Sequence, residues 1–169
     1  MNQLEALFAE YPCTLTDESV KTAVEDILAK HFDENNNVEV WKQCLHSIDL
    51  TTLNGEDTTE KVETMAQRVN EFEDHFPGVP NVAAMCVYPA LVQTAADTLT
   101  EPIGIAAVAA GFPASQTFIE VKIAEAAMAV AAGATEIDIV ISIGKFLEGN
   151  YQEVLMKSAP AAIARMEAL

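Results

Sequence analysis

Residues 103–142 read IGIAAVAAGFPASQTFIEVKIAEAAMAVAAGATEIDIVIS, and this stretch decides the fold. Its two ends, 103–110 and 136–142, are apolar runs with the length and composition of buried strands. Between them, Ser115 is suited to capping a long helix and Gly133 to ending it. A strand, a helix and a second strand in this order predict one βα unit that leads into a parallel sheet.

The same alternation continues on both sides of this stretch. Residues 48–53 and 82–88 form two more apolar runs, and a capping box that starts at Asp57 predicts a helix between them. A helix through Thr98 follows the second run, and another begins near Asn150. Four apolar strands that alternate with four helices indicate an α/β fold with a parallel sheet. The strand spacing is close to the roughly 30 residues of a (β/α) barrel unit, although a small doubly wound sheet has the same periodicity.

The first 45 residues differ from the rest because they read as polar and helical. Thr16 and Asp17 are suited to capping one helix, and residues 38–45 to forming a second one after a loop at 34–37. We therefore expect an N-terminal helical extension over residues 1–45, packed on the outside of the main domain.

Composition limits the partners and the compartment. The sequence has 9 Lys and Arg against 26 Asp and Glu, a formal net charge of −17. Such a charge repels nucleic acid and anionic membranes, so neither is an expected partner. No apolar stretch reaches the ~20 residues of a membrane span, and the N-terminus lacks the features of a secretory signal. Cys13, Cys44 and Cys86 are odd in number and widely spaced, as in a reduced protein, and we expect a cytoplasmic location.

Three polar residues interrupt the apolar strands, and they are the candidates for chemistry: Asp49, Cys86 and Asp138. In parallel α/β folds, ligands bind beyond the carboxyl ends of the strands. A buried carboxylate without a partner is costly, so Asp138 is either catalytic or a structural hydrogen-bond acceptor. Alternation places it on the opposite face from Ile137 and Ile139. Cys86 is either a reactive thiol or a small buried apolar residue.

Other signals of chemistry are missing from the sequence or have a simpler explanation. The chain contains no GxGxxG, and its three histidines show no metal-ligand spacing, so we expect no metal site. Gly144-Lys145 lacks the earlier glycine of a phosphate-binding loop. Residues 112–115 could point backbone amides at an anion where a helix begins, but a plain strand-to-helix turn also explains them.

Several motifs occur in the order in which deoxyribose-phosphate aldolases carry them. They are Asp-Leu-Thr-Thr-Leu-Asn at 49–54, Cys-Val-Tyr-Pro at 86–89, Val-Ala-Ala-Gly-Phe-Pro-Ala-Ser at 108–115, Glu-Ile-Asp-Ile-Val at 136–140 and Gly-Lys-Phe-Leu-Glu-Gly-Asn at 144–150. The chain resembles this family from about Ser47 to Val154. The resemblance implies a TIM barrel of (β/α) units, no metal or organic cofactor, and a small phosphorylated sugar as substrate. The implied reaction is the reversible cleavage of 2-deoxy-D-ribose 5-phosphate to D-glyceraldehyde 3-phosphate and acetaldehyde.

In that family a lysine forms a Schiff base with the substrate, a second lysine lowers the pKa of the first, and an aspartate on the fourth strand takes part in proton transfer. The resemblance assigns the aspartate's role to Asp138, and it makes Asp49 and Cys86 supporting residues of the substrate site. The family's lysines lie on the sixth and seventh strands, which the predicted units do not include. Lys145 and Lys157 match neither of them and read as surface residues.

We therefore expect a half barrel over residues 46–154, with about four of eight units, that has no Schiff-base lysine and is inactive alone. Residues 155–169 no longer resemble the family, and Pro160 interrupts their helical pattern. They predict an atypical C-terminal helix or the end of a truncated or frameshifted frame, and a natural half-length product is the alternative.

Four units leave two open sheet edges and an uncovered apolar face, which invite pairing with another chain. We expect a homo-oligomer, or aggregation, through the exposed sheet edges. Two other hypotheses stay open on the sequence. One is a non-catalytic half-barrel that acts by self-assembly or by complementing another chain, and the other is an unrelated doubly wound binding domain.

Overall fold

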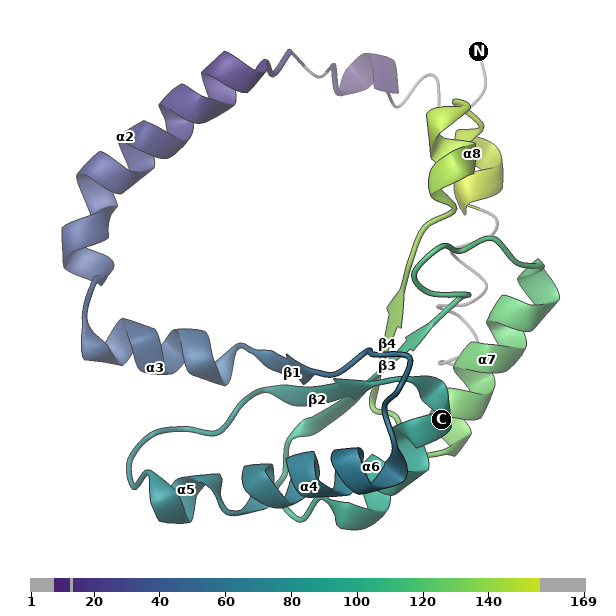
Figure 1. The fold of residues 1–169 in the computed structure, drawn as a ribbon. Coiled ribbons are helices and arrows are strands. Elements are labelled where there is room, and N and C mark those ends of the chain that lie inside the picture. Colours follow the sequence, from purple (N-terminus) through teal and green to yellow (C-terminus); the bar gives the residue numbers. More distant parts are fainter. Residues whose placement is uncertain (1–7, 13, 156–169) are drawn as a thin grey trace. The chain divides into compact units, whose positions relative to one another are not determined.

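The computed structural model describes residues 8–12 and 14–155, and Figure 1 shows their helices and strands. The chain divides into two compact units, Met1–Cys44 and Leu45–Leu169. The elements in chain order are α2 (Asp17–Asn35), α3 (Val38–His46), β1 (Asp49–Thr51), α4 (Thr59–Asn70), α5 (Phe72–His75), β2 (Ala84–Val87), the 3₁₀ helix η1 (Pro89–Leu91), α6 (Val92–Thr98), β3 (Gly104–Ala109), α7 (Ile119–Ala131), β4 (Glu136–Ile139) and α8 (Ile143–Leu147). All of these strands lie in the second unit, which therefore holds the predicted site residues.

The first unit contains α2 and most of α3, the two helices that the sequence predicts. Thr16 is the N-cap of α2: its Oγ1 accepts from the Ser19 amide at 3.1 Å, while Ser19 Oγ accepts from the Thr16 amide at 2.9 Å. This capping box satisfies two amides that a helix start leaves without partners. No residue of α2 is buried, so apolar side chains such as Val20, Ile27 and Phe32 are exposed.

The second unit is built on a parallel sheet of four strands in the order β1-β2-β3-β4. Each strand pairs with the next one along the chain, so every crossover moves in the same direction. A doubly wound sheet reverses its strand order at a switch point, and this sheet does not. The second unit is therefore a half barrel, four successive (β/α) units of the TIM type, and the doubly wound hypothesis is wrong.

Helices cover one face of the sheet and form the main core with it. Figure 1 shows α4, α6 and α7 on the same side of the strands. The strand residues of this core are Met85, Val87, Ile105 and Ala107, and the helix residues include Val62, Ala66, Val92, Ala95 and Ala129. Burying a Met or Val side chain stabilises the fold by about 1.5–3 kcal/mol, so this face supplies most of the unit's hydrophobic stabilisation.

Side-chain amides tie together the loops at the amino-terminal ends of the strands. Asn70, the last residue of α4, donates to the Thr98 carbonyl at 2.9 Å and accepts from the Thr100 amide at 2.9 Å. The buried Asn81, just before β2, donates to the Val69 carbonyl at 2.8 Å. These bonds satisfy backbone groups in loops that the strand ladders do not reach. They hold the end of the sheet that lies opposite the candidate site.

Two predicted helix caps are corrected by the structure. The helix expected from Asp57 has Thr58 as its N-cap, because the Thr58 hydroxyl accepts from the Lys61 amide at 3.2 Å. The helix expected from Ser115 has Phe118 as its N-cap, without a side-chain cap hydrogen bond. Ser115 instead lies in the preceding loop with a positive φ of 55°. Its hydroxyl does not cap the helix but accepts from Lys122 and donates to the Val140 carbonyl.

The strands are shorter than the apolar runs that predict them. β4 ends at Ile139 because its pairing with β3 stops at Ala109, and α8 then begins at Ile143, before the helix expected from about Asn150. Residues 151–155 are helical, in agreement with that expectation. The predictions for Lys157, for Pro160 and for the rest of 156–169 fall outside the described residues.

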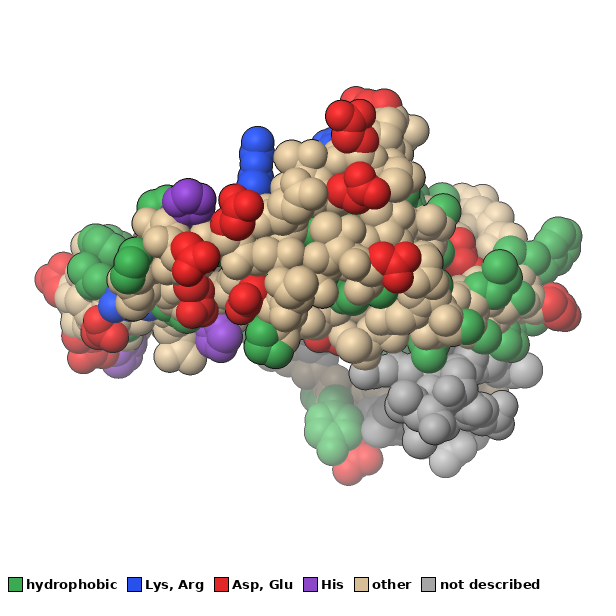
Figure 2. Space-filling model, turned by 90° about the horizontal axis from the view of Figure 1, so that it is seen from below, with side chains coloured by type: hydrophobic (Ala, Val, Ile, Leu, Met, Phe, Trp, Pro, Cys, Tyr) green, Lys and Arg blue, Asp and Glu red, His purple; other side chains and the backbone are tan. Residues whose placement is uncertain are grey.

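Acidic side chains dominate the charged surface. Figure 2 shows Asp and Glu side chains scattered over the visible face, with far fewer Lys and Arg. This distribution agrees with a solvated acidic surface and with the net charge of −17. Within the described ranges, none of the helices combines the length and the apolar composition that crossing a membrane would require.

Candidate active site

The strand register brings the three predicted site residues to one face of the sheet. Residues that are paired in a parallel sheet point to the same side, and alternate residues along a strand do so as well. One residue from each strand forms a row across the sheet: Thr51, Cys86, Ala106 and Glu136. Asp49 is two residues before this row on β1, and Asp138 is two residues after it on β4. Asp49, Cys86 and Asp138 therefore share a face, as their assignment to one site requires.

We call this side the helix-free face and define it by Asp49, Thr51, Cys86, Ala106, Val108, Glu136 and Asp138. Its apolar centre is the buried cluster of Cys86, Ala106 and Val108, against which Leu53, Tyr88 and Phe112 pack. The cluster contains no residue of an α-helix, in contrast to the core on the other side. The helix-free face corresponds to the interior of a closed barrel.

The charge on this face is negative and lies on the two outer strands. Asp49 is on β1, and Glu136 and Asp138 are on β4, while β2 and β3 between them carry no charged residue. All three carboxylates are exposed to solvent, so Asp138 does not need the buried partner that the sequence led us to expect. None of the described strands contributes Lys, Arg or His to this face.

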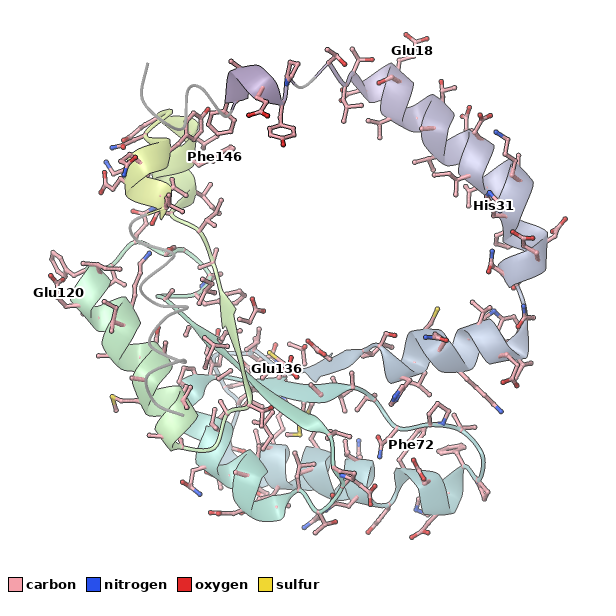
Figure 3. All side chains as sticks on the ribbon, turned by 180° about the vertical axis from the view of Figure 1, so that it is seen from behind. Glu18, His31, Phe72, Glu120, Glu136 and Phe146 are labelled. Carbon is pink, nitrogen blue, oxygen red and sulfur yellow. The ribbon has the colours of Figure 1, made fainter. Side chains whose placement is uncertain are left out.

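Glu136 is a member of this face that the sequence analysis did not single out. Figure 3 labels it on β4, and its carboxylate lies close to Gly104 of the neighbouring strand. A Cβ atom at Gly104 would be 2.5 Å from Glu136 Oε1, so the missing side chain makes room for the carboxylate. The signal that could have found Glu136 is its alternation with Ile137 and Asp138, which places both acidic residues on one side.

Cys86 lies near the middle of this face and is only 4% exposed. Burial raises the pKa of its thiol above the ordinary value, and the carboxylates of Asp138, Asp49 and Glu136 raise it further, against a hydrogen bond with Thr51. Each of the two raising effects disfavours the thiolate, which is the nucleophilic form of cysteine. The geometry therefore favours the second of the two interpretations of Cys86, a small buried apolar residue.

The loop after β1 holds a compact polar network around Asp57. The Asp57 carboxylate accepts from the Thr52 hydroxyl at 2.9 Å and from the Asn54 amide at 3.0 Å, and it also pairs with Lys61. Its side chain is 1% exposed. The hydrogen bond from Lys61, opposed by burial, lowers the pKa of Asp57 to about 2. The network fixes the loop at the carboxyl end of β1, where ligands bind in this fold class.

Two lysines lie near the carboxyl end of β4, and they differ strongly in environment. Lys145 is partly exposed and pairs with Glu148 at 2.9 Å and with Glu153 at 3.7 Å, and its bond with Glu148 raises its pKa. Lys122 of α7 is 1% exposed, and its ammonium group donates to the hydroxyls of two serines. The sequence analysis did not single out Lys122, because a lysine in a helix is ordinarily solvated.

Among the described residues, no three His, Cys, Asp or Glu side chains are grouped so that they could hold a metal ion.

A comparison with known families decides the class of protein. A model of the DeoC/LacD family of aldolases matches residues 44–162, which is more than half of the chain. The chain belongs to this family. The matched segment contains every strand of the half barrel and all residues of the helix-free face, so the family resemblance of the sequence is confirmed.

Relatives in the DeoC/LacD family are deoxyribose-phosphate aldolases. The human enzyme is 38% identical over 147 aligned residues, covering 79% of this chain and 46% of the human protein. The bovine enzyme is 38% identical over 117 residues, covering 62% of this chain and 36% of its own length. The chain thus spans less than half the length of these curated relatives.

Solved structures of aldolases share the fold. The aldolase QR15 superposes with a TM-score of 0.62 at 24% identity, covering 71% of this chain and 50% of its own. The deoxyribose phosphate aldolase from Aeropyrum pernix, described as tetrameric, gives a TM-score of 0.58 at 23% identity, covering 78% of this chain and 53% of its own. In both comparisons the match spans about half of the aldolase, in line with a half barrel.

Proposed function

We propose that this chain supplies one half of a deoxyribose-phosphate aldolase, with Asp138 as its proton-transferring residue. The observation that carries the proposal is that Asp49, Cys86 and Asp138 share the helix-free face of a family half barrel. Asp138 lies nearest the carboxyl ends of the strands among the three acidic residues, at the edge where TIM-barrel enzymes place their chemistry. Asp49 and Cys86 lie deeper on the same face and would support the substrate site.

The proposed reaction is a retro-aldol cleavage of 2-deoxy-D-ribose 5-phosphate through an imine. A lysine nitrogen attacks the substrate carbonyl carbon, and the carbonyl oxygen leaves as water. The C2–C3 bond then breaks, the C3 hydroxyl loses its proton, and the electron pair moves into the imine to give an enamine. Protonation of C2 and hydrolysis release acetaldehyde after glyceraldehyde 3-phosphate has left. We assign to Asp138 the transfer of these protons, because its exposed carboxylate can reach a ligand on this face.

The lysine of this reaction has to come from a segment other than the four described strands. Their helix-free face contributes no lysine, and Lys122 is enclosed behind serine hydroxyls. The family places its two lysines on later strands of the barrel. We therefore expect the chain alone to be inactive, and we expect it to act in the cytoplasm, without a cofactor, together with a lysine-bearing half.

A borohydride trap tests this proposal directly. Borohydride reduces an imine to a stable amine, so the intact mass of the chain records whether any of its lysines reacts with deoxyribose 5-phosphate. We expect no adduct on this chain and a stoichiometric adduct on the human enzyme as positive control. An adduct on this chain would contradict the proposal, and mapping it would identify the reactive lysine.

Complementation tests the role of Asp138. We expect cleavage activity when the chain is mixed with a fragment of the human enzyme that carries the lysine-bearing strands. Asp138→Asn should lower that activity by about 10²-fold or more, the range of general acid–base catalysis. Glu136→Gln, on the same strand and face, is the matched control and should retain most of the activity. Equal losses of activity in both variants would show that cleavage needs the negative charge of the helix-free face in general, and that Asp138 has no special role.

A second candidate function is a non-catalytic half-barrel that acts by self-assembly. The observation that favours it is that β1 and β4 each pair on one side only within the described sheet. Carboxylates on both outer strands should repel a second copy, so self-association should strengthen with added salt, which screens them. Sedimentation velocity at several salt concentrations measures this. A monomer at every salt and protein concentration would exclude the self-assembly function.

A further inference from the structure

The loop between β1 and α4 contains the dipeptide Asn54-Gly55, the one Asn-Gly pair in the sequence. The other asparagines precede larger residues: Asn36 is followed by a second asparagine, for example, and Asn70 by a glutamate. The backbone amide that follows an asparagine can attack the side-chain carboxamide. Glycine hinders this attack least, because it has no side chain and the widest choice of backbone angles. Of the chain's asparagines, Asn54 therefore has the least hindered neighbouring amide.

The loop leaves both reacting groups accessible. Asn54 and Gly55 are exposed, and a Cβ atom at Gly55 would meet nothing within 4 Å. No described residue accepts a hydrogen bond from the Gly55 amide. The Asn54 carboxamide makes only long hydrogen bonds, from Nδ2 to Thr52 Oγ1 at 3.3 Å and to Asp57 Oδ1 at 3.4 Å. Bonds of this length restrain a side chain weakly, so the carboxamide is free to turn toward the Gly55 nitrogen.

We propose that Asn54 is a site of spontaneous deamidation, in which the Gly55 amide nitrogen attacks Cγ of the Asn54 side chain. The bond from this nitrogen to Cγ forms, its proton passes through water to Nδ2, and Nδ2 leaves as ammonia. Water then opens the resulting succinimide ring. Opening at Cγ gives aspartate, and opening at the backbone carbonyl carbon gives isoaspartate. Water is the only co-reactant, and no group is oxidised or reduced.

Either product places a new carboxylate beside Asp57. The Asp57 side chain is 1% exposed and is stabilised by its ion pair with Lys61 and by the Thr52 hydroxyl. Deamidation replaces the Nδ2 donor of Asn54 with an oxygen, so a donor-acceptor contact becomes a contact between two negatively charged groups. Two carboxylates then compete for the one ammonium group of Lys61, and like charges this close disfavour each other. The modification should therefore weaken the network that fixes this loop.

Isoaspartate changes the backbone of the loop as well. In the intact loop the Asn54 amide donates to Asp57 Oδ2 at 3.0 Å, and the Asn54 carbonyl accepts from the Asp57 amide at 3.1 Å. In isoaspartate the chain runs through Cγ, so this carbonyl becomes part of a free carboxylate and the turn grows by a methylene group. The preceding residue, Leu53, packs against the apolar centre of the helix-free face, and its carbonyl accepts from the Tyr88 hydroxyl at 3.3 Å. The modification thus loosens a loop that borders the candidate site.

Peptide mapping by mass spectrometry tests the inference on the folded chain, incubated in mildly alkaline buffer without denaturant. We expect the peptide that contains Asn54 to convert first, into aspartate and isoaspartate forms that separate by chromatography. Gly55→Ala is the matched variant and should slow the conversion by about tenfold or more, because a side chain hinders the attack and narrows the backbone angles. Its new Cβ has open space around it, so the fold should be retained.

Three results of the mapping would overturn the proposal. They are conversion at Asn36 as fast as at Asn54, an equal rate in Gly55→Ala, and conversion at Asn54 only after urea is added. The last of these would mean that the folded loop protects the asparagine. Because the measurement does not involve cleavage of a substrate, its failure is distinct from a failure of the aldolase proposal.

Asn54→Asp measures the effect of the new charge separately. We expect this variant to lower the urea midpoint at neutral pH by roughly 0.5 M, because the added carboxylate repels Asp57. Asn54→Ser is the neutral control and should lower the midpoint by less than about 0.2 M, because it removes only the long hydrogen bonds of the carboxamide. Equal shifts in the two variants, or no shift in Asn54→Asp, would show that deamidation leaves the Asp57 network intact, contrary to the proposed consequence.

Discussion

The two faces of the sheet use the same four strands but are built on opposite chemistry. Met85, Val87, Ile105 and Ala107 point toward the helices and are buried in an apolar core. Asp49, Glu136 and Asp138 point the other way and are exposed carboxylates. The helix-covered face supplies the main core, whereas the helix-free face combines a smaller buried cluster with exposed carboxylates, and only these carboxylates can be replaced with little effect on folding. Alternation along a strand thus separates stability from chemistry residue by residue.

The largest expected effect comes from the helix-covered face. Met85→Ala removes a fully buried side chain and should lower the free energy of unfolding by about 2–5 kcal/mol, through lost burial and the cavity left behind. Urea denaturation followed by circular dichroism measures it. Met128→Ala on the outer surface of α7, where Met128 is 71% exposed, is the control and should cost less than about 0.5 kcal/mol. Similar losses in both variants would break the distinction between core and surface.

Gly104→Ala adds a side chain on the helix-free face and should have the next largest effect. The added Cβ would lie 2.5 Å from Glu136 Oε1 and 3.1 Å from Ala84 Cβ, so side chains must shift at a cost of about 1–3 kcal/mol. Glu136→Ala in the same chain should recover part of this loss. Gly55→Ala, with no atom within 4 Å of the new Cβ, is the control. If Gly104→Ala lowers the free energy of unfolding equally in the Glu136→Ala chain, the strain comes from the contact with Ala84.

The contribution of Asp57 to the stability of the fold depends on pH. Its pKa of about 2 in the folded chain lies below the ordinary value of 3.8, so it stabilises the fold above about pH 4, and this stabilisation is lost as the pH falls toward 2. Asp57→Asn should be less stable at neutral pH and should lose less stability over that acid window. Urea midpoints measured from pH 2 to pH 6 check this, with the exposed Asp74→Asn as control. If the urea midpoint of Asp57→Asn fell between pH 6 and pH 2 as much as that of the unmodified chain, the predicted role of Asp57 would be contradicted.

The smallest expected effect belongs to the helix-free face. Asp138→Asn should change the free energy of unfolding by less than about 0.5 kcal/mol, because the carboxylate is exposed. The same urea experiment that measures Met85→Ala measures it. A loss above 1 kcal/mol would mean that Asp138 is a structural acceptor, which is the alternative that the sequence left open.

Much of this architecture can be predicted from the sequence because it depends on periodicity. The apolar runs located the four strands, Thr16 located the start of α2, and the alternation around Asp138 assigned it to the correct face. Strand order could not be predicted in this way, because barrel and doubly wound sheets share one pattern of elements. The observed order β1-β2-β3-β4, without a reversal, distinguishes the two.

The residues that the sequence did not reveal depend on contacts between distant segments. Lys122 became notable only when folding buried it against Ser115 and Ser142, which lie in other loops. Asp57 fits a capping-box pattern with Glu60, and only its bonds with Lys61 and Thr52 show where its carboxylate goes.

The position of the carboxylates on the outer strands has a consequence for solubility. An edge strand presents unpaired amides and carbonyls, and a charged side chain on that strand discourages another strand from adding to it. In this sheet both edge strands carry acidic residues and neither central strand does. A carboxylate kept for proton transfer would then also act as a gatekeeper against aggregation, so neutralising it for a kinetic experiment would also make the chain more prone to form fibrils.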